Sequence, residues 1–399
     1  MHNVKRAEYK AKMRDPKVAA GLQHKASQWY KLSAGLLKQA KSEPQAPEAR
    51  QAILDLTSNL LLVNPDPLYI WNHRRTVLMT TEENKSDESK GTETQATGTD
   101  GSEETAEDTA KTEGSDNPKD NDPLREEWSL TQSCLERNPK AYAVWFHRKW
   151  CVLESLKRTP SDSDHLLQKE LELTKLFLQY DERNFHCWNY RRFLVGCLVD
   201  PEAADEELRA GSGGTEETPT NGGLLFGRQV GNRGTVDSDT EGNSGQVSFD
   251  KIRSVLQTEM DFTMEKIQEN FSNGSAFHYR SKLLPFVLSY ARQQDGDDSS
   301  VIEAELELVH NAVFTEPDDQ TAWWYFAQVL LPHLDTSVLE QEVEMLQDLV
   351  EEEDFKTKWG MLGLHQVYDR LGRTEEKRDI LDKLVELDPD RKKRYLSMK

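Results

Sequence analysis

Few residues of this 399-residue chain stand at a spacing that a known chemistry requires. The sequence contains no phosphate-cradling GxxxxGK[ST] motif, no dinucleotide-binding GxGxxG motif after a strand pattern and no metalloprotease HExxH motif. Lys140 follows Pro139 at a predicted helix start, where the helix dipole disfavours a cation. This uncompensated placement favours a functional role for Lys140, although the chain by itself does not look like a complete enzyme.

A second chemical pattern is a phrase that recurs five times. It reads aromatic, any residue, His or Tyr, and then Arg in four of the five copies, which are Trp71-Asn72-His73-Arg74, Trp145-Phe146-His147-Arg148, Trp188-Asn189-Tyr190-Arg191, Phe277-His278-Tyr279-Arg280 and Trp323-Trp324-Tyr325-Phe326. The aromatic residue and the Arg lie on one helix face, where they could share a cation–π contact. Alternatively, the aromatic residues are core packing and the Arg bonds carbonyls or acids of the neighbouring unit, which we favour for Arg74 and Arg280.

The five copies predict a stack of helical hairpins. In each unit, a first helix with an apolar stripe is followed by a short turn, commonly with Pro, and by a second helix that carries the phrase. With two long inserts removed, the distances between copies fall in the range for two-helix repeats. We therefore expect an all-α fold. The fifth copy has Phe326 in place of Arg, which indicates a unit near the end of the array, and residues 342–398 predict a sixth, divergent unit plus a cap.

Two acidic inserts interrupt the predicted array. Residues 81–122 contain 14 Asp and Glu and 4 Lys residues, and residues 200–250 contain 11 Asp and Glu and 3 Arg residues, so the inserts hold most of the net charge of −21. Both are too poor in large apolar residues to offset chain entropy, and we expect disordered loops. We divide the chain into an N-terminal segment with an amphipathic helix, residues 1–47, and a helical-repeat array, residues 48–399.

Composition also argues against several classes of protein. The acidic inserts would repel phosphate, which disfavours nonspecific nucleic-acid binding. No stretch approaches the roughly 20 apolar residues that span a bilayer, and the N-terminus lacks the apolar core of a signal peptide. The four cysteines lie in apolar-periodic segments without CxxC spacing, so we expect buried free thiols and a cytoplasmic protein; they are Cys134, Cys151, Cys187 and Cys197.

Longer phrases around the copies carry a family resemblance. Residues 138–145, Asn-Pro-Lys-Ala-Tyr-Ala-Val-Trp, resemble the signature repeat of protein prenyltransferase α subunits. Residues 181–192, 270–280 and 305–320 resemble more particularly the α subunits of type II geranylgeranyltransferases, the enzymes that act on Rab GTPases. The resemblance covers about residues 48–330 without the inserts.

The resemblance implies a right-handed superhelical crescent of antiparallel helical hairpins that works as one half of a heterodimer. The partner β subunit would supply the zinc ligands and most of the lipid pocket, so this chain would bind no metal or cofactor alone. The reaction would move a geranylgeranyl group from geranylgeranyl diphosphate to C-terminal cysteines of Rab GTPases presented by an escort protein. Such a reaction needs a zinc-activated thiolate and positive charge that stabilises the departing diphosphate.

The resemblance also implies roles for individual residues. By the family motif, Lys140 reaches the diphosphate and Tyr142 lines the mouth of the active site. A family N-terminus can lie over the partner's zinc, which makes His2 a minor candidate for a metal contact. In the CaaX enzymes, the farnesyl- and type I geranylgeranyltransferases, a Gln after that Tyr holds the peptide carboxylate. Here the position is Ala143, whose methyl group cannot donate a hydrogen bond.

Two alternatives remain beside the type II interpretation. One is the α subunit of the CaaX enzymes, against which Ala143 and the phrase at residues 270–273 speak. The other is a non-catalytic helical-repeat scaffold, although the units lack the pattern of tetratricopeptide repeats. The sequence leaves no room for the immunoglobulin-like and leucine-rich domains of animal type II α subunits, which favours a short, fungal-like form.

Overall fold

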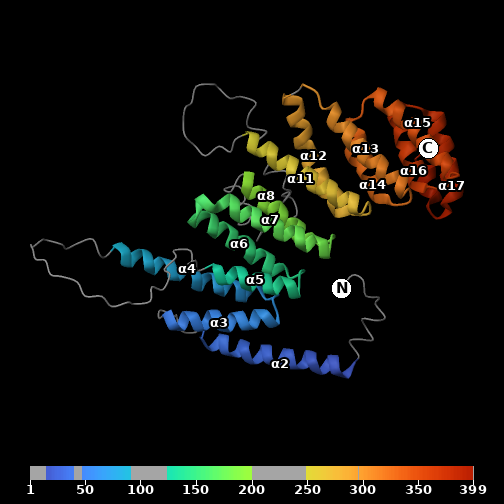
Figure 1. The fold of residues 1–399 in the computed structure, drawn as a ribbon. Helices are drawn as coiled ribbons and strands as arrows, with labels where there is room; N and C mark the ends of the chain where they lie inside the picture. The colour runs from blue at the N-terminus through green and yellow to red at the C-terminus, as the bar shows by residue number, and fades with distance from the viewer. Residues whose placement is uncertain (1–14, 40–46, 91–123, 200–248, 295, 399) are drawn as a thin grey trace, which may run out of the picture. The chain divides into compact units, whose positions relative to one another are not determined.

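The computed structural model describes residues 15–39, 47–90, 124–199, 249–294 and 296–398, and every regular element in this part of the chain is helical (Figure 1). The all-α expectation is therefore confirmed for these residues. The chain divides into two compact units, Met1–Ser163 and Asp164–Lys399, which we describe separately. His2 lies outside the described residues.

The first unit is built from helix pairs. Its helices are α2 (Pro16–Gln39), α3 (Pro47–Val63), α4 (Leu68–Lys90), α5 (Arg125–Arg137) and α6 (Tyr142–Arg158), followed by a short 3-10 turn (Pro160–Asp162). The pairs α3–α4 and α5–α6 are hairpins, and α3 also packs on α5. The N-terminal helix that we separated from the array packs on α3 and belongs to this same unit.

The second unit continues the pattern. Its helices are α7 (Ser163–Tyr180, beginning at the boundary), α8 (Phe185–Val199), α11 (Phe249–Glu269), α12 (Gly274–Gln294), α13 (Ser299–Thr315), α14 (Gln320–Tyr325), α15 (Thr336–Glu352), α16 (Lys358–Leu371), α17 (Thr374–Leu387) and α18 (Lys392–Ser397). Shorter pieces are a π-helical turn (Phe326–Leu330) and two 3-10 turns (Leu331–His333 and Pro389–Arg391). Figure 1 shows α11, α12 and α13 following one another as neighbouring helices.

The first insert begins later than we expected from the sequence. Helix α4 continues to Lys90, so residues 81–90 are helical although we assigned them to a disordered loop. Glu and Lys residues have good intrinsic helix propensity, so this acidic stretch can continue the helix. Helix α11 likewise starts at Phe249, within the second predicted insert. Residues 91–122 and 200–248 lie outside the described residues.

A buried glutamate links successive hairpins. Glu259, on the first helix of its hairpin, accepts two hydrogen bonds from the Arg191 guanidinium of the preceding hairpin, at 2.8 and 2.6 Å. It also accepts the Tyr279 hydroxyl of its own hairpin at 2.9 Å. Two other buried glutamates make the same pair of contacts, namely Glu305 with Arg280 and Tyr325, and Glu127 with Arg74 and His147. The Arg of the repeated phrase therefore connects two hairpins, as we favoured for Arg74 and Arg280.

The spacing of this network is constant along the chain. The Tyr or His follows its glutamate by 20 residues in four hairpins, at Glu127–His147, Glu170–Tyr190, Glu259–Tyr279 and Glu305–Tyr325. The Arg follows by 17 residues a buried Thr whose hydroxyl accepts from it, at Thr57–Arg74, Thr131–Arg148, Thr174–Arg191 and Thr263–Arg280. A fixed offset between the two helices means that these hairpins close with the same register.

The Trp of the phrase holds the hairpin turn. Its indole Nε1 donates to a backbone carbonyl six residues earlier, at 2.8 to 2.9 Å, in the pairs Trp71–Pro65, Trp145–Pro139, Trp188–Glu182 and Trp323–Pro317. All four rings are buried, so they are core residues as the packing interpretation requires. Two arginines of the phrase lie instead over rings of other helices, with Arg148 over Trp128 and Arg191 over Phe262.

The array changes character after the fifth copy of the phrase. Phe326, in the position of the Arg, is buried and meets Trp323 edge to face. The next buried glutamate, Glu342, instead accepts from His310 at 3.0 Å. A Cβ at Gly363 would lie 2.6 Å from a ring carbon of Trp323, so only glycine allows α16 to pack this closely. Phe326 thus marks the last regular unit, with two further helix pairs beyond it.

The cysteines of the described helices lie in the protein interior. All four cysteines are free and buried, as we predicted. Burial raises the pKa of the Cys134 thiol to about 12, so this thiol is protonated at neutral pH. Within the described residues, no helix combines the length and apolar character that crossing a membrane would require.

The Glu127 network contains a neutral histidine. Burial lowers the pKa of His147 to about 4, and this effect outweighs the favourable hydrogen bond to Glu127. The Arg75 Nε–H donates to His147 Nδ1 at 3.1 Å, so the imidazole carries its proton on Nε2 and donates it to Glu127 at 2.8 Å. Burial raises the pKa of Glu127, but the hydrogen bonds from His147 and Arg74 prevail and lower it to about 2.

Removing a linking glutamate should destabilise the fold strongly. Glu305→Ala leaves the buried Arg280 guanidinium without its carboxylate, and we expect a loss of about 3–5 kcal/mol in unfolding free energy. Glu303→Ala, on the exposed face of the same helix, should change it by no more than about 0.5 kcal/mol. Urea denaturation of the two variants measures the difference. Equal losses would show that the pair is not a structural link.

The neutral histidine predicts a pH-dependent stability. Since the native pKa of about 4 lies below the ordinary value of 6.5, the unfolded chain binds the proton first, and stability falls as pH drops from 6.5. Between pH 6.5 and 4.5 the contribution of His147 to the free energy of unfolding falls by about 2 kcal/mol. His147→Tyr, which places here the residue found in the three later copies of the phrase, should flatten this slope in urea denaturation at the two pH values. The exposed-site control His24→Tyr should keep the wild-type slope, and an unchanged slope in His147→Tyr would contradict the assignment.

Candidate active site

The site predicted from sequence lies at the turn between α5 and α6. The Asn138 side chain accepts from the Lys140 backbone N–H at 3.2 Å, and its carbonyl accepts from Ala141 N–H at 3.1 Å. Trp145 Nε1 donates to the Pro139 carbonyl at 2.8 Å and ties the turn to the helix that follows. The backbone of Lys140 is thereby held from both sides, while its side chain is half-buried.

Tyr142 is the first residue of α6 and is 57% exposed. Its ring stacks on Phe146, with ring centres 6.1 Å apart and planes inclined by 18°. The Arg75 guanidinium of α4 covers Phe146 at 4.8 Å and reaches the Trp150 ring at 5.6 Å. An exposed phenol therefore continues a row of rings along one face of α6, and a cation lies over that row.

Arg75 brings positive charge to this row from the neighbouring hairpin. Burial lowers the pKa of its guanidinium to about 10, so it remains charged at neutral pH. One terminal nitrogen, Nη2, is buried and has no hydrogen-bond partner among the described residues. The Nε–H donates to His147, which ties Arg75 to the Glu127 network. The site region thus combines Arg75 on α4 with Lys140 in the turn before α6.

Ala143 follows Tyr142 and is 3% exposed. The family motif places a Gln here in the CaaX enzymes, whereas this chain presents only a buried methyl group. No hydrogen-bonding side chain at this position can therefore meet a peptide carboxylate.

The described residues do not form a metal centre of their own. Among them, no group of three or more His, Cys, Asp and Glu side chains could hold a metal ion.

What the site offers chemically is an ammonium and a phenol at the start of one helix. A Lys ammonium binds anionic oxygens by charge, and a Tyr hydroxyl adds a directed hydrogen bond. The structure places Lys140 and Tyr142 in one turn, as their spacing required. It adds Phe146, Trp150 and Arg75, which sequence reasoning missed. The four-residue spacing of Tyr142, Phe146 and Trp150 was the available signal, because such residues share a helix face.

Comparison with known proteins gives this turn a family context. The family model for the protein prenyltransferase alpha subunit repeat matches residues 124–155, 167–198 and 256–286. These ranges correspond to the hairpins α5–α6, α7–α8 and α11–α12. The first of them contains Lys140, Tyr142 and the linking glutamate Glu127.

Curated relatives agree with the repeat match. The chain is 32% identical over 290 residues to the geranylgeranyl transferase type-2 subunit alpha of Bos taurus, an alignment that covers 72% of this chain and 35% of the relative. It is 24% identical to the Schizosaccharomyces pombe protein of the same name, with 67% and 83% covered. For the Candida albicans protein of that name the identity is 22%, with 99% and 96% covered.

The chain spans about a third of the length of the mammalian relatives and nearly the full length of the Candida albicans one. The repeats and these relatives point the same way. This chain belongs to the family of protein prenyltransferase alpha subunits, among the relatives named geranylgeranyl transferase type-2 subunit alpha.

Proposed function

We propose that this chain is the alpha subunit of a heterodimeric geranylgeranyltransferase that modifies Rab GTPases in the cytoplasm. The observation that carries the proposal is the turn of the matched repeat, where Lys140 and the exposed Tyr142 lie together on a rigid backbone. The names of the curated relatives support the same activity. The described residues of this turn offer a cation and a phenol, and we propose that a partner subunit supplies the rest of the site.

The proposed partner is a β subunit that holds the zinc and the lipid. Large apolar side chains are exposed at the beginnings of the second helices, which suits docking of another protein; in the first unit these are Leu68, Tyr69 and Tyr142, and in the second Phe185. Zinc on the partner would supply the substrate cysteine as thiolate. His2 stays a candidate for reaching that metal.

In the proposed reaction the thiolate sulfur forms a bond to C1 of geranylgeranyl diphosphate. The bond between C1 and the diphosphate oxygen breaks, and the diphosphate leaves with the electron pair. The Lys140 ammonium would stabilise the negative charge that develops on this leaving group. Tyr142 would orient the reactants at the mouth of the site by its hydroxyl and its ring. An escort protein would present the Rab C-terminus.

Lys140 provides the direct test of catalysis. In the heterodimer obtained by co-expression with a β subunit, we expect Lys140→Ala to lower the transfer rate by roughly 10-fold or more, because charge stabilisation of the leaving group is lost. Turnover is measured with labelled geranylgeranyl diphosphate and escorted Rab protein. Lys157→Ala, which changes an exposed lysine near the end of α6, should keep the wild-type rate. An unchanged transfer rate in the Lys140→Ala heterodimer would favour the non-catalytic scaffold.

Substrate choice separates the two enzyme classes. Because position 143 offers only a buried methyl group, we expect the heterodimer to modify an escorted Rab protein and to leave a CaaX peptide unmodified. Both substrates are offered to the same purified complex with labelled geranylgeranyl or farnesyl diphosphate. Efficient turnover of the peptide alone would instead assign the chain to the CaaX enzymes.

A further inference from the structure

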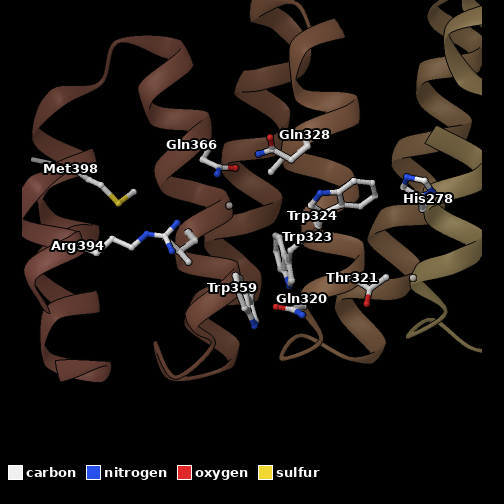
Figure 2. Close-up of a pocket in the computed structure, with 14 residues that line it drawn as sticks. His278, Gln320, Thr321, Trp323, Trp324, Gln328, Trp359, Gln366, Arg394 and Met398 are labelled. Atoms are coloured by element: carbon white, nitrogen blue, oxygen red, sulfur yellow. The ribbon is translucent and has the colours of Figure 1, made fainter. Parts of the chain in front are cut away.

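The second unit contains a pocket that the proposed reaction does not use. Its volume is about 710 Å³, and it lies between α12, α14, α16 and α18, as Figure 2 shows. Pockets of roughly 300–1,000 Å³ are typical of ligand sites in proteins. Lys140 and Tyr142 belong to the first unit and take no part in it.

The walls of the pocket are aromatic. Trp324 of α14 and Trp359 of α16 both line it, and Trp324 is 40% exposed. The His278 ring of α12 lies 6.3 Å from the Trp324 ring, centre to centre. Exposed indoles cost free energy in water and provide large, rigid contact surfaces for an apolar side chain. The pocket therefore suits the binding of an apolar side chain.

The charge of the pocket is positive. Among the described residues that line it, none is Asp or Glu, although the chain has 71 acidic residues. Arg394 of α18 lines it and contributes a guanidinium group. Burial, then the charges of Lys282 and Arg192, lowers the pKa of His278, so these two cations also act on this region. A carboxylate is the group that complements such a surface.

Amides complete the lining. Gln320, Gln328 and Gln366 border the pocket, and Figure 2 shows the last two near each other at one end. The Gln366 Oε1 atom is buried and has no hydrogen-bond partner within the described part of the chain. A buried amide oxygen without a donor is costly, and a bound group with an N–H would satisfy it. A peptide backbone carries that N–H together with carbonyls for the amide donors.

We propose that this pocket binds a segment of a partner protein in which a large apolar side chain stands next to a carboxylate. The apolar side chain packs against Trp324 and Trp359, and the carboxylate pairs with Arg394. A backbone N–H of the segment donates to Gln366 Oε1. The proposal is independent of prenyl transfer, because it uses only groups of the second unit.

The test uses the full-length chain and fluorescein-labelled peptides. The acidic apolar probe is Gly-Ser-Gly-Glu-Leu-Phe-Glu-Gly-Ser-Gly, one control has Lys in place of both Glu, and another has Ser in place of Leu and Phe. By fluorescence anisotropy, we expect the first probe to bind at least about 10-fold more tightly than either control, because each lacks one of the two complementary groups.

Variants assign the binding to the pocket. Arg394→Glu and Trp324→Ser should each weaken the acidic probe by about 10-fold or more. Matched controls are Lys393→Glu, the exposed neighbour on α18, and Phe314→Ser, an exposed aromatic on α13, and both should bind as the wild type does. Circular dichroism verifies that the variants fold.

Three outcomes would overturn the proposal. They are equal binding of the acidic and basic probes, equal effects of Arg394→Glu and Lys393→Glu, and absence of binding. A peptide with the sequence of residues 218–230 of this chain is tested as well. If it bound more tightly than the probe, the pocket would bind a segment of this chain itself, and the proposal of a partner would be overturned.

Discussion

A buried carboxylate that serves two helical hairpins is the interaction on which the rest of the structure depends. Glu259 and Glu305 each neutralise an Arg from the preceding hairpin and accept a Tyr hydroxyl from their own. Burying either charge alone would cost several kcal/mol, so the contacts persist only together. Because the partners come from consecutive hairpins, the pairing fixes how one hairpin packs on the next, whereas apolar contacts alone would tolerate sliding.

The same packing produces the candidate active site. The indole of Trp145 is buried in the hairpin core, and its N–H reaches back to the carbonyl of Pro139. Core packing thereby fixes the backbone of the turn that carries Lys140. The neighbouring network supplies a second cation, since Arg75 is attached to Glu127 through the neutral His147. The stability of the repeat and the geometry of the turn rest on one set of buried groups.

Variation at equivalent positions gives individual hairpins their own properties. His147 stands where the three later copies of the phrase have Tyr, and only a histidine offers an acceptor to Arg75 on its second nitrogen. Phe326 replaces the Arg, and with it the charged link to the next glutamate disappears. Beyond this point Gly363 lets Trp323 approach, and Trp324 and Trp359 remain beside an acid-free pocket. Hairpins that close with the same register can therefore carry different functional side chains.

The sequence alone determined the helical repeat, the hairpin turns, the buried cysteines and the proximity of Lys140 and Tyr142, because these follow from local periodicity and from residues two apart. The offsets of 20 and 17 residues were also present in the sequence, but the glutamates looked like ordinary helix residues until their partners were visible. Tertiary structure decided which acids of the next hairpin pair with Arg74 and Arg280. It also decided that Arg75 covers Phe146 and that the second unit holds a positive pocket. These contacts join residues far apart in the chain, and no local pattern specifies which distant side chains share a desolvated space.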